Sequence, residues 1–246
     1  MVLSGDEFVK ELQGMVRKKH SKDHPVIGMI ENGELSRGAL KGFVGQFYLF
    51  FPKPFPKPIA AMLGRCPEDA VLEKMWIENV VEEGTGEITG TDSHKGLFFR
   101  FAEACGCSKE ELDRVEPLPE TEAFLDWREL LIYERSWLEL YAGQGFCLEG
   151  TASARMTRVV NGLTKHYGFD RNSEALRYWT LHMSVDEEHM LVGPEAVKKY
   201  AVSEVQQEQV RHAVQKTLDM LWLAFDGIKR AFVDQDPLYA PWRNGQ

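Results

Sequence analysis

The feature that most restricts the fold of this chain is the spacing of its apolar residues. In almost every segment they recur every three to four residues, as on one face of an α-helix, and no stretch has the long apolar–polar alternation expected of a half-buried strand. Three pairs, Ser4 with Glu7, Ser108 with Glu111 and Ser203 with Gln206, match the capping box that opens a helix. The sequence therefore predicts an all-α protein of seven or eight helices.

Prolines and glycines mark the expected helix boundaries in the first half of the chain. An aromatic-rich helix should begin near Ser36 and be interrupted by the prolines between residues 52 and 58, so this segment must bend or loop. Pro67 suits the first turn of the next helix, which the glycine-rich stretch 84–90 ends. A further helix is expected to start around His94.

The second half of the chain should contain four longer helices. We expect them at about 121–141, from there to Tyr167, at about 172–192, and from Ser203 to Phe232. No internal repeat, low-complexity linker or shift in composition divides the sequence. We therefore expect one helical domain over residues 1–246, with a peripheral tail from about 234 to 246.

Composition excludes several classes of protein. With 43% hydrophobic and 27% charged residues the chain should be globular, and a formal net charge of −9 argues against nucleic acid or an anionic membrane as partner. The densest basic run, residues 17–19, is interpreted as a solvated helix end. No run approaches the about 20 apolar residues of a membrane span, and the N-terminus lacks the features of a signal peptide. The four cysteines form no Cys-x-x-Cys motif, so we expect a reduced, cytoplasmic protein.

One helix is expected to carry a stripe of potential metal ligands. His182, Asp186 and His189 lie at positions i, i+4 and i+7, which places their side chains on one helix face over two turns. Two imidazoles and a carboxylate suit a divalent transition metal. Solvated surface residues are the alternative interpretation of the same stripe.

Other ligands of a buried metal must come from other helices. Glu82, Glu83 and His94 flank the glycine-rich stretch, where a helix end and the next helix start can converge. Glu149 is a lone acid in a run of small and apolar residues, which favours an inward orientation. The candidate set is Glu83, His94, Glu149, His182, Asp186 and His189. Three carboxylates nearly balance two divalent cations, and six ligands suit the dinuclear non-haem iron centres that react with O2.

These segments together resemble a known family. Four segments resemble the haem-oxygenase-like diiron oxidases. They are residues 78–83 (Glu-Asn-Val-Val-Glu-Glu), the stretch from His94 to Gly106, residues 148–152 (Leu-Glu-Gly-Thr-Ala) and the His-x-x-x-Asp-x-x-His pattern of 182–189. The wider group includes the chlamydial death-domain-associating protein and the TenA and PqqC folds. The resemblance extends from about residue 42 to 192.

The resemblance implies a haem-oxygenase-like bundle of seven helices that binds two Fe(II) ions per chain. The implied ligands are the six candidates named above, with manganese as an alternative metal and a site that can be partly empty in isolated protein. His94 follows Glu83 at a longer distance than in some relatives, so Glu82 or Glu87 remains an alternative to Glu83.

The implied activity is oxidation of a small organic substrate, amino-acid-derived, with O2 as co-substrate. N-oxygenation, desaturation and C–C cleavage are the outcomes known in the family. Such an enzyme needs no nucleic acid or membrane partner, and the resemblance allows an external reductant and a homodimer. Two alternatives stay open: a cofactor-free PqqC-like or TenA-like enzyme, in which Cys147 is a candidate nucleophile, and a non-enzymatic protein that binds a partner.

Residues outside the candidate centre are interpreted as structural. His20, His24 and His212 lie among charged residues and should be solvated. The aromatic stretch 47–55 should form core, although its prolines allow it to bend around a pocket over the metals.

Overall fold

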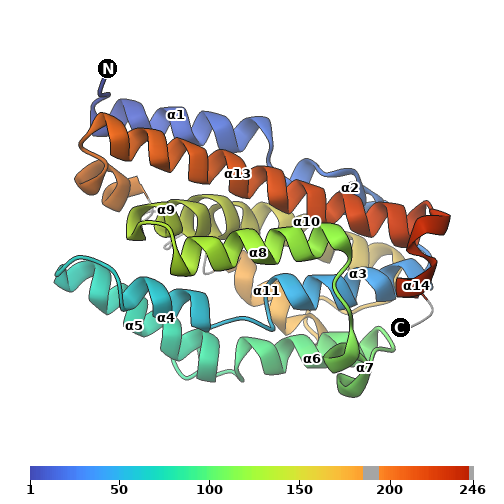
Figure 1. Cartoon of the computed structure of the whole chain (residues 1–246). Helices are drawn as coiled ribbons and strands as arrows, with labels where there is room; N and C mark the ends of the chain where they lie inside the picture. The colour runs from blue at the N-terminus through green and yellow to red at the C-terminus, as the bar shows by residue number, and fades with distance from the viewer. Residues whose placement is uncertain (185–193, 244–246) are drawn as a thin grey trace.

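Helices account for the secondary structure throughout the part of the chain that the computed structural model describes, residues 1–184 and 194–243 (Figure 1). The longest helix, α13 (Glu204–Ile228), packs along α8 (Pro119–Tyr133) and lies beside α1 (Gly5–Lys18). Helix α1 begins at one end of the bundle and the short α14 (Ala240–Arg243) lies at the other. The all-α expectation is confirmed.

The other elements follow in chain order. The α-helices are α2 (Pro25–Glu31), α3 (Arg37–Phe50), α4 (Lys57–Leu63), α5 (Ala70–Thr85), α6 (His94–Ala104), α7 (Lys109–Arg114), α9 (Trp137–Tyr141), α10 (Ala152–His166) and α11 (Arg177–Ser184), and residues 194–200 are also helical. Short 3-10 turns are Ser21–Asp23, Glu149–Thr151, Glu174–Leu176 and Pro237–Tyr239, and π-helical segments are η2 (Ala142–Leu148) and Lys229–Val233.

A cluster of aromatic rings around Trp179 joins the helices that carry the candidate ligands. The indole of Trp179, on α11, is fully buried and contacts the rings of Phe47 on α3 and Phe101 on α6 at centroid distances of 4.9 and 5.1 Å. Aromatic side chains of this size contribute most of the energy of a core. The cluster therefore holds α11 against α6. The expectation that the aromatic stretch on α3 forms core is confirmed.

One expected helix start and one expected unbroken helix are wrong because local capping decides where these helices begin. The helix predicted to begin at Pro67 begins at Ala70, since the carboxylate of Asp69 accepts hydrogen bonds from the first free N–H groups. The helix predicted over 121–141 is two helices, α8 and α9. Ser136 and Glu139 form a capping box that starts α9 after a break.

The C-terminal segment, which was expected to be peripheral, is anchored to the bundle through Tyr239 and through Trp242, whose indole donates to the carbonyl of Pro117. Tyr239 is buried, and its hydroxyl donates a hydrogen bond to Glu120 on α8. The guanidinium of Arg230 lies 3.2 Å from the same carboxylate. This contact fixes the start of α14 against the core.

Neither a membrane span nor a disulfide is found in the described residues. None of their helices combines the length and the apolar character that crossing a bilayer requires. All four cysteines lie within this part of the chain, and their thiols are free.

Candidate metal centre

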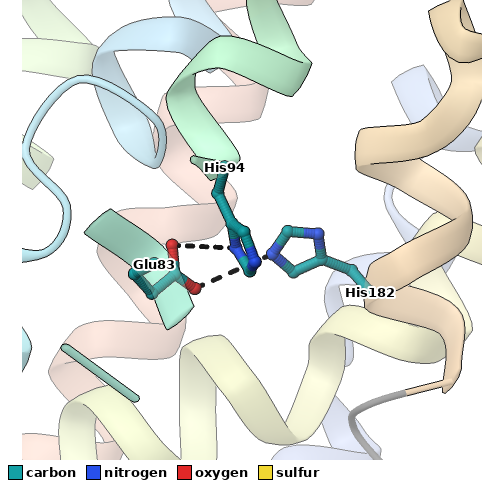
Figure 2. Close-up of side chains that lie close together, drawn as sticks. All are labelled: Glu83, His94 and His182. Atoms are coloured by element: carbon teal, nitrogen blue, oxygen red, sulfur yellow. Dashed lines mark ion pairs between the residues drawn. The ribbon is translucent and has the colours of Figure 1, made fainter. Parts of the chain in front are cut away.

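Three side chains with metal-binding atoms meet where α5, α6 and α11 converge (Figure 2). Glu83 comes from the last turn of α5, His94 from the first turn of α6 and His182 from α11, and one ligand atom of each lies within 4.8 Å of the other two. The Oε2 atom of Glu83 is 3.0 Å from Nδ1 of His94, and its Oε1 atom is 3.9 Å from Nε2 of His182. Three of the six predicted ligands are thus brought together.

The turn between α5 and α6 places Glu83 opposite His94. Helix α5 ends at a glycine, Gly86, whose φ of 68° lies in the left-handed region that glycine adopts without strain. Any side chain there would collide with the backbone of Asp92. Ser93 then caps α6, so that His94 is the first residue of the helix and its ring faces back toward α5. The glycine-rich stretch therefore closes the gap between the two ligands.

The tautomer of His182 is fixed by its own helix. Its Nδ1 atom lies 2.6 Å from the carbonyl oxygen of Tyr178, one turn earlier. A carbonyl can only accept, so Nδ1 carries a proton, and in the neutral ring Nε2, the atom on the side of Glu83, is the acceptor. Metal-binding histidines commonly have one nitrogen anchored in this way.

The ring of His94 is oriented by a second carboxylate. The Nε2 atom of His94 lies 3.3 Å from Oε1 of Glu82, which is buried. Thr89 donates to Glu82 through both its N–H, at 3.1 Å, and its hydroxyl, at 2.5 Å. Burial of Glu82 acts to raise its pKa, but the hydrogen bonds from Thr89 and the contact with His94 lower it overall. Glu82 is therefore an ionised acceptor that fixes the ring of His94 at Nε2, on the side away from Glu83.

The remaining nitrogen of His94 indicates that a cation fits this site. When Nε2–H donates to Glu82, Nδ1 is an acceptor, and it faces a carboxylate oxygen of Glu83 at 3.0 Å. This buried Nδ1 makes no hydrogen bond, because the contact with Glu83 is close but poorly aligned. Two acceptors that face each other in a buried site repel unless a cation or a proton lies between them. The donor set of two imidazoles and a carboxylate suits iron, manganese or zinc.

Glu83 is negatively charged in this setting. Burial of the carboxyl would raise its pKa, but protons on the facing nitrogens of His182 and His94 donate hydrogen bonds to it, carry positive charge, outweigh burial and lower the pKa to about 2. A metal cation at these nitrogens would take the place of those protons. An ionised carboxylate between two imidazoles supplies the negative charge that a buried cation needs.

A small cavity adjoins Glu83 and His182. It has a volume of about 20 Å³ and is also lined by Glu149, Arg155 and Phe51. This is enough space for a water-sized molecule or ion, which occupies ~10–15 Å³ by this measure. The aromatic wall comes from the end of the stretch 47–55, which was expected to bend around a pocket.

Glu149 lines the wall of this cavity, but it is not part of the close cluster of three. Its Oε1 atom accepts a hydrogen bond of 3.4 Å from Gln144 on the π-helical segment η2. Asp186 and His189, the other two predicted ligands, lie outside the described residues.

The alternatives to Glu83 can be compared directly. Glu87 is exposed and lies in the turn after α5. Glu82 contacts His94 on the nitrogen opposite to the one that faces Glu83. The geometry therefore favours Glu83 as the residue that shares a cation with both imidazoles.

Other side chains considered from the sequence take structural positions. Cys147 is fully buried, burial raises the pKa of its thiol well above the usual range, and the thiol donates to the carbonyl of Val214. Such a thiol is poorly suited to nucleophilic attack. His20 and His24 were expected to be solvated, which is wrong. His20 is half-buried and its Nδ1 accepts a hydrogen bond from the N–H of Lys22. The ring of His24 is fully buried, with Nε2 3.1 Å from Asp226 and Nδ1 accepting from the N–H of Val26, so it caps α2.

One charged residue of the site was missed. Arg155 is fully buried on α10, lines the small cavity and donates to the hydroxyls of Ser21 and Thr151. Its guanidinium lies 5.1 Å from the centre of the Phe51 ring. An arginine on a helix without a nearby acid in the sequence carries no signal of burial, so sequence reasoning could not find it.

Comparison with solved structures defines the class of fold. A TenA homologue from Pseudomonas syringae pv. tomato superposes with a TM-score of 0.78 at 16% identity, covering 91% of this chain and 93% of that one. A domain from Shewanella denitrificans described as having a heme oxygenase-like fold gives a TM-score of 0.67 at 12% identity over 94% and 93% of the two chains. The fold is therefore haem-oxygenase-like, as the sequence resemblance implied.

Comparison with protein sequences identifies the family. A family described as iron-containing redox enzymes matches residues 41–222, and the chain belongs to this family. A 4-aminobenzoate synthase of Chlamydia muridarum is 29% identical over 74% of both chains, and one of Nitrosomonas europaea is 24% identical over 92% of both. A pyrroloquinoline-quinone synthase of Xanthomonas oryzae pv. oryzae is 24% identical over 94% of this chain and 90% of its own. The chain is an iron-dependent redox enzyme related to both groups.

Proposed function

We propose that this protein is a non-haem diiron oxidase or oxygenase that uses O2 to oxidise a small, amino-acid-derived substrate. The observation that carries the proposal is the convergence of Glu83, His94 and His182, with a buried Nδ1 of His94 that has no hydrogen bond. Membership of the family of iron-containing redox enzymes supports iron as the metal.

The ligands of the two iron ions come from three parts of the chain. Glu83, His94 and His182 hold iron at the junction of α5, α6 and α11, and Glu149 adds a carboxylate from the adjoining cavity wall. We include Asp186 and His189 as the remaining ligands because they continue the stripe that begins at His182. Bound ferrous ions supply the electrons with which O2 is reduced.

The protein's own groups keep the site ordered and dry. Glu82 fixes the ring of His94 and the carbonyl of Tyr178 fixes that of His182, so each imidazole presents one defined nitrogen. Arg155 adds a buried positive charge near Glu83 and Glu149, which offsets part of their charge when metal is absent. The aromatic wall limits water near the reacting atoms.

The class of substrate is suggested by relatives. Two of the similar proteins are named 4-aminobenzoate synthases, and 4-aminobenzoate is a small acid that contains nitrogen. This supports a small amino-acid-derived substrate and an outcome such as N-oxygenation, desaturation or C–C cleavage.

A cofactor-free oxidation is the second candidate, favoured by the similarity to a pyrroloquinoline-quinone synthase over most of the chain. In that case Glu83, His94 and His182 would bind the substrate directly or pair with one another. The contact between two acceptors at His94 and Glu83 is better relieved by a metal cation than by an organic molecule.

Reaction with O2 tests the proposal. Anaerobic protein loaded with Fe(II) is mixed with O2 in a stopped-flow instrument, and O2 consumption and visible absorption are followed. We expect rapid O2 uptake with a transient absorption in the wild type and in His212→Ala, an exposed control. Both signals should disappear in His182→Ala. Equal signals in His182→Ala, or none in the wild type, would overturn the proposal.

A further inference from the structure

Four oxidisable aromatic rings follow one another from α5 to the surface of the protein. Trp76 on α5 contacts Tyr141 on α9, with the two ring centres 5.6 Å apart. Tyr141 contacts Trp137 at 5.2 Å, and Trp137 contacts Tyr200 at 5.6 Å. Trp76 and Tyr141 are buried, whereas Trp137 and Tyr200 are partly exposed. These four rings form an aromatic path that leads from the interior toward solvent.

The inner end of the aromatic path lies on the helix that carries Glu83. Glu83 follows Trp76 by seven residues, so the two side chains lie on one face of α5, two turns or about 10 Å apart along the helix axis. Trp76 and Tyr141 also line a cavity of about 260 Å³ that Glu149 lines as well. The path therefore begins beside the candidate metal centre.

The two tryptophans of the path are suited to lose an electron without losing a proton. The buried Nε1 atoms of Trp76 and Trp137 make no hydrogen bond with any described residue. An indole N–H can only donate, and its proton leaves only where an acceptor is present. Each indole can therefore give up an electron and regain one with its covalent structure unchanged.

Tyr200, at the outer end of the path, has a proton acceptor beside it. Its hydroxyl donates a hydrogen bond of 2.8 Å to Oδ2 of Asp69, which is partly exposed. The ammonium of Lys199 lies 5.1 Å from the centre of the Tyr200 ring and disfavours a positive charge on that ring. Loss of an electron from Tyr200 is therefore accompanied by transfer of its proton to Asp69, which passes it to water.

Tyr178 and Trp179 lie close to His182 but lead into the core. The ring centres of Tyr178 and His182 are 4.5 Å apart, and those of Tyr178 and Trp179 are 5.5 Å apart. Trp179 is fully buried, and its other ring contacts among the described residues are with phenylalanines. A phenyl ring is much harder to oxidise than an indole or a phenol. Of the two sets of rings, the one that begins at Trp76 is therefore the one that reaches the surface.

We propose that the aromatic path carries electrons from the surface to the iron centre, so that the enzyme oxidises soluble hydrogen-atom donors at Tyr200 when O2 reacts without the main substrate. This inference rests on the proposed oxidase function and adds a second, protective activity to it. Without substrate, the groups nearest to the oxidised centre are the protein's own side chains, such as Met75 in the adjoining cavity. An electron supplied through the path reduces the centre before these side chains are damaged.

The transfer of each electron is balanced along the path. Trp76 gives an electron to the O2-oxidised iron centre and regains one from Trp137 across the ring of Tyr141, which keeps its proton. Trp137 regains its electron from Tyr200, whose proton goes to Asp69 and then to water. The phenoxyl radical of Tyr200 takes a hydrogen atom from a soluble donor of the ascorbate or thiol class. The net change is oxidation of the donor by one electron, reduction of the centre by one electron and release of one proton.

Electron paramagnetic resonance tests whether the path is used. Protein loaded with Fe(II) is mixed with O2 without substrate or reductant and frozen at intervals. We expect a tyrosyl radical signal, identified by its change when the protein contains ring-deuterated tyrosine. The signal should be lost in Tyr200→Phe and in Trp137→Phe but remain in Trp222→Phe, a half-buried tryptophan outside the path. A signal unchanged in Tyr200→Phe or Trp137→Phe, or no tyrosyl radical while O2 is consumed, would overturn the proposal.

Peptide mapping by mass spectrometry tests the protective activity. A methionine thioether is readily oxidised to the sulfoxide, so Met75 reports oxidation beside the centre. After repeated exposure of the iron-loaded protein to O2 with ascorbate, oxidation of Met75 should be several-fold greater in Trp137→Phe than in the wild type or Trp222→Phe. Equal oxidation in the three proteins would contradict protection by the path.

A photo-oxidant separates the path from the metal centre. In metal-free protein with Cys66→Ser and Val80→Cys, a rhenium photo-oxidant is attached to the new thiol, one turn from Trp76 on the same helix. After a flash we expect a tyrosyl radical that is lost on Tyr200→Phe. If this radical forms but the iron-loaded protein consumes no O2, the proposed oxidase function fails while the path stands. If O2 is consumed but Tyr200 is not oxidised, the path alone fails.

Discussion

Glu83 and His182 come from different halves of the chain, yet Oε1 of Glu83 lies 3.9 Å from Nε2 of His182. Glu83 lies on α5 and His182 on α11, so the contact requires the packing of two separate helices. It depends on the aromatic cluster that packs α11 against α6 and on the turn at Gly86 that brings α5 to the same junction. The junction is therefore the place where a change of one side chain should affect metal binding without unfolding the bundle.

Replacement of Glu82 should weaken metal binding without changing the number of metals bound. In Glu82→Gln the carboxylate that orients His94 is lost, while the ligand atoms remain, and loss of such an orienting partner typically lowers metal affinity by about 10–100-fold. Competition with a chromophoric chelator measures the affinity. An unchanged affinity would show that Glu82 does not position His94, and complete loss of one metal would make it a ligand.

His20 should remain neutral at pH values where an ordinary histidine is protonated. Its pKa is lowered from 6.5 to about 4, chiefly by burial. Between these two values the unfolded chain binds a proton that the folded protein does not, so the free energy of unfolding should fall as the pH falls from 6.5 to 4.

NMR titration measures this directly. The Cε1–H resonance of His20, assigned by its absence in His20→Gln, should not shift between pH 7.5 and 5. Urea unfolding at pH 7 and pH 5 should reveal a smaller loss of stability in His20→Gln than in the wild type. A resonance with its midpoint near 6.5 would contradict burial of the ring.

The anchor of the C-terminal segment should contribute measurably to stability. Tyr239→Phe removes a buried hydrogen bond to the carboxylate of Glu120, and we expect the free energy of unfolding to fall by about 2 kcal/mol. The neighbouring Leu238→Ala, at an exposed side chain, should cost much less. Chemical denaturation compares the two. Similar losses would mean that the hydroxyl of Tyr239 has no special role.

Most helices could be predicted from the sequence because the residues that start them act locally. Ser4, Ser108 and Ser203 begin helices at the residues where capping boxes are formed. The helix start predicted at Pro67 was wrong because Asp69 caps the helix at Ala70, and the break before Ser136 was missed because apolar residues continue at helical spacing across it. A capping residue can be recognised in a sequence, but the sequence alone does not show whether the cap or the surrounding pattern of residues decides where the helix begins.

The site was predictable where ligand residues recur at helical spacing or flank a break. Glu83, His94 and His182 could be named in this way, and the structure brings them together. The role of Glu82 could not be separated from that of Glu83, because adjacent residues differ only in the direction of their side chains. The burial of Arg155 and the small cavity beside Glu149 depend on packing between distant helices, which leaves no local signal.

Anaerobic titration with Fe(II) tests the central claim most directly, by comparing wild type with Glu83→Gln and Glu87→Gln. Both variants remove one carboxylate of the same helix end, but Glu83 is largely enclosed and lies close to His94 and His182, whereas Glu87 is exposed. We predict two iron ions per chain in the wild type and in Glu87→Gln, and affinity lowered at least about tenfold, with fewer ions bound, in Glu83→Gln. Identical binding in the two variants, or no stoichiometric iron in the wild type, would contradict the assignment of this junction as the metal centre.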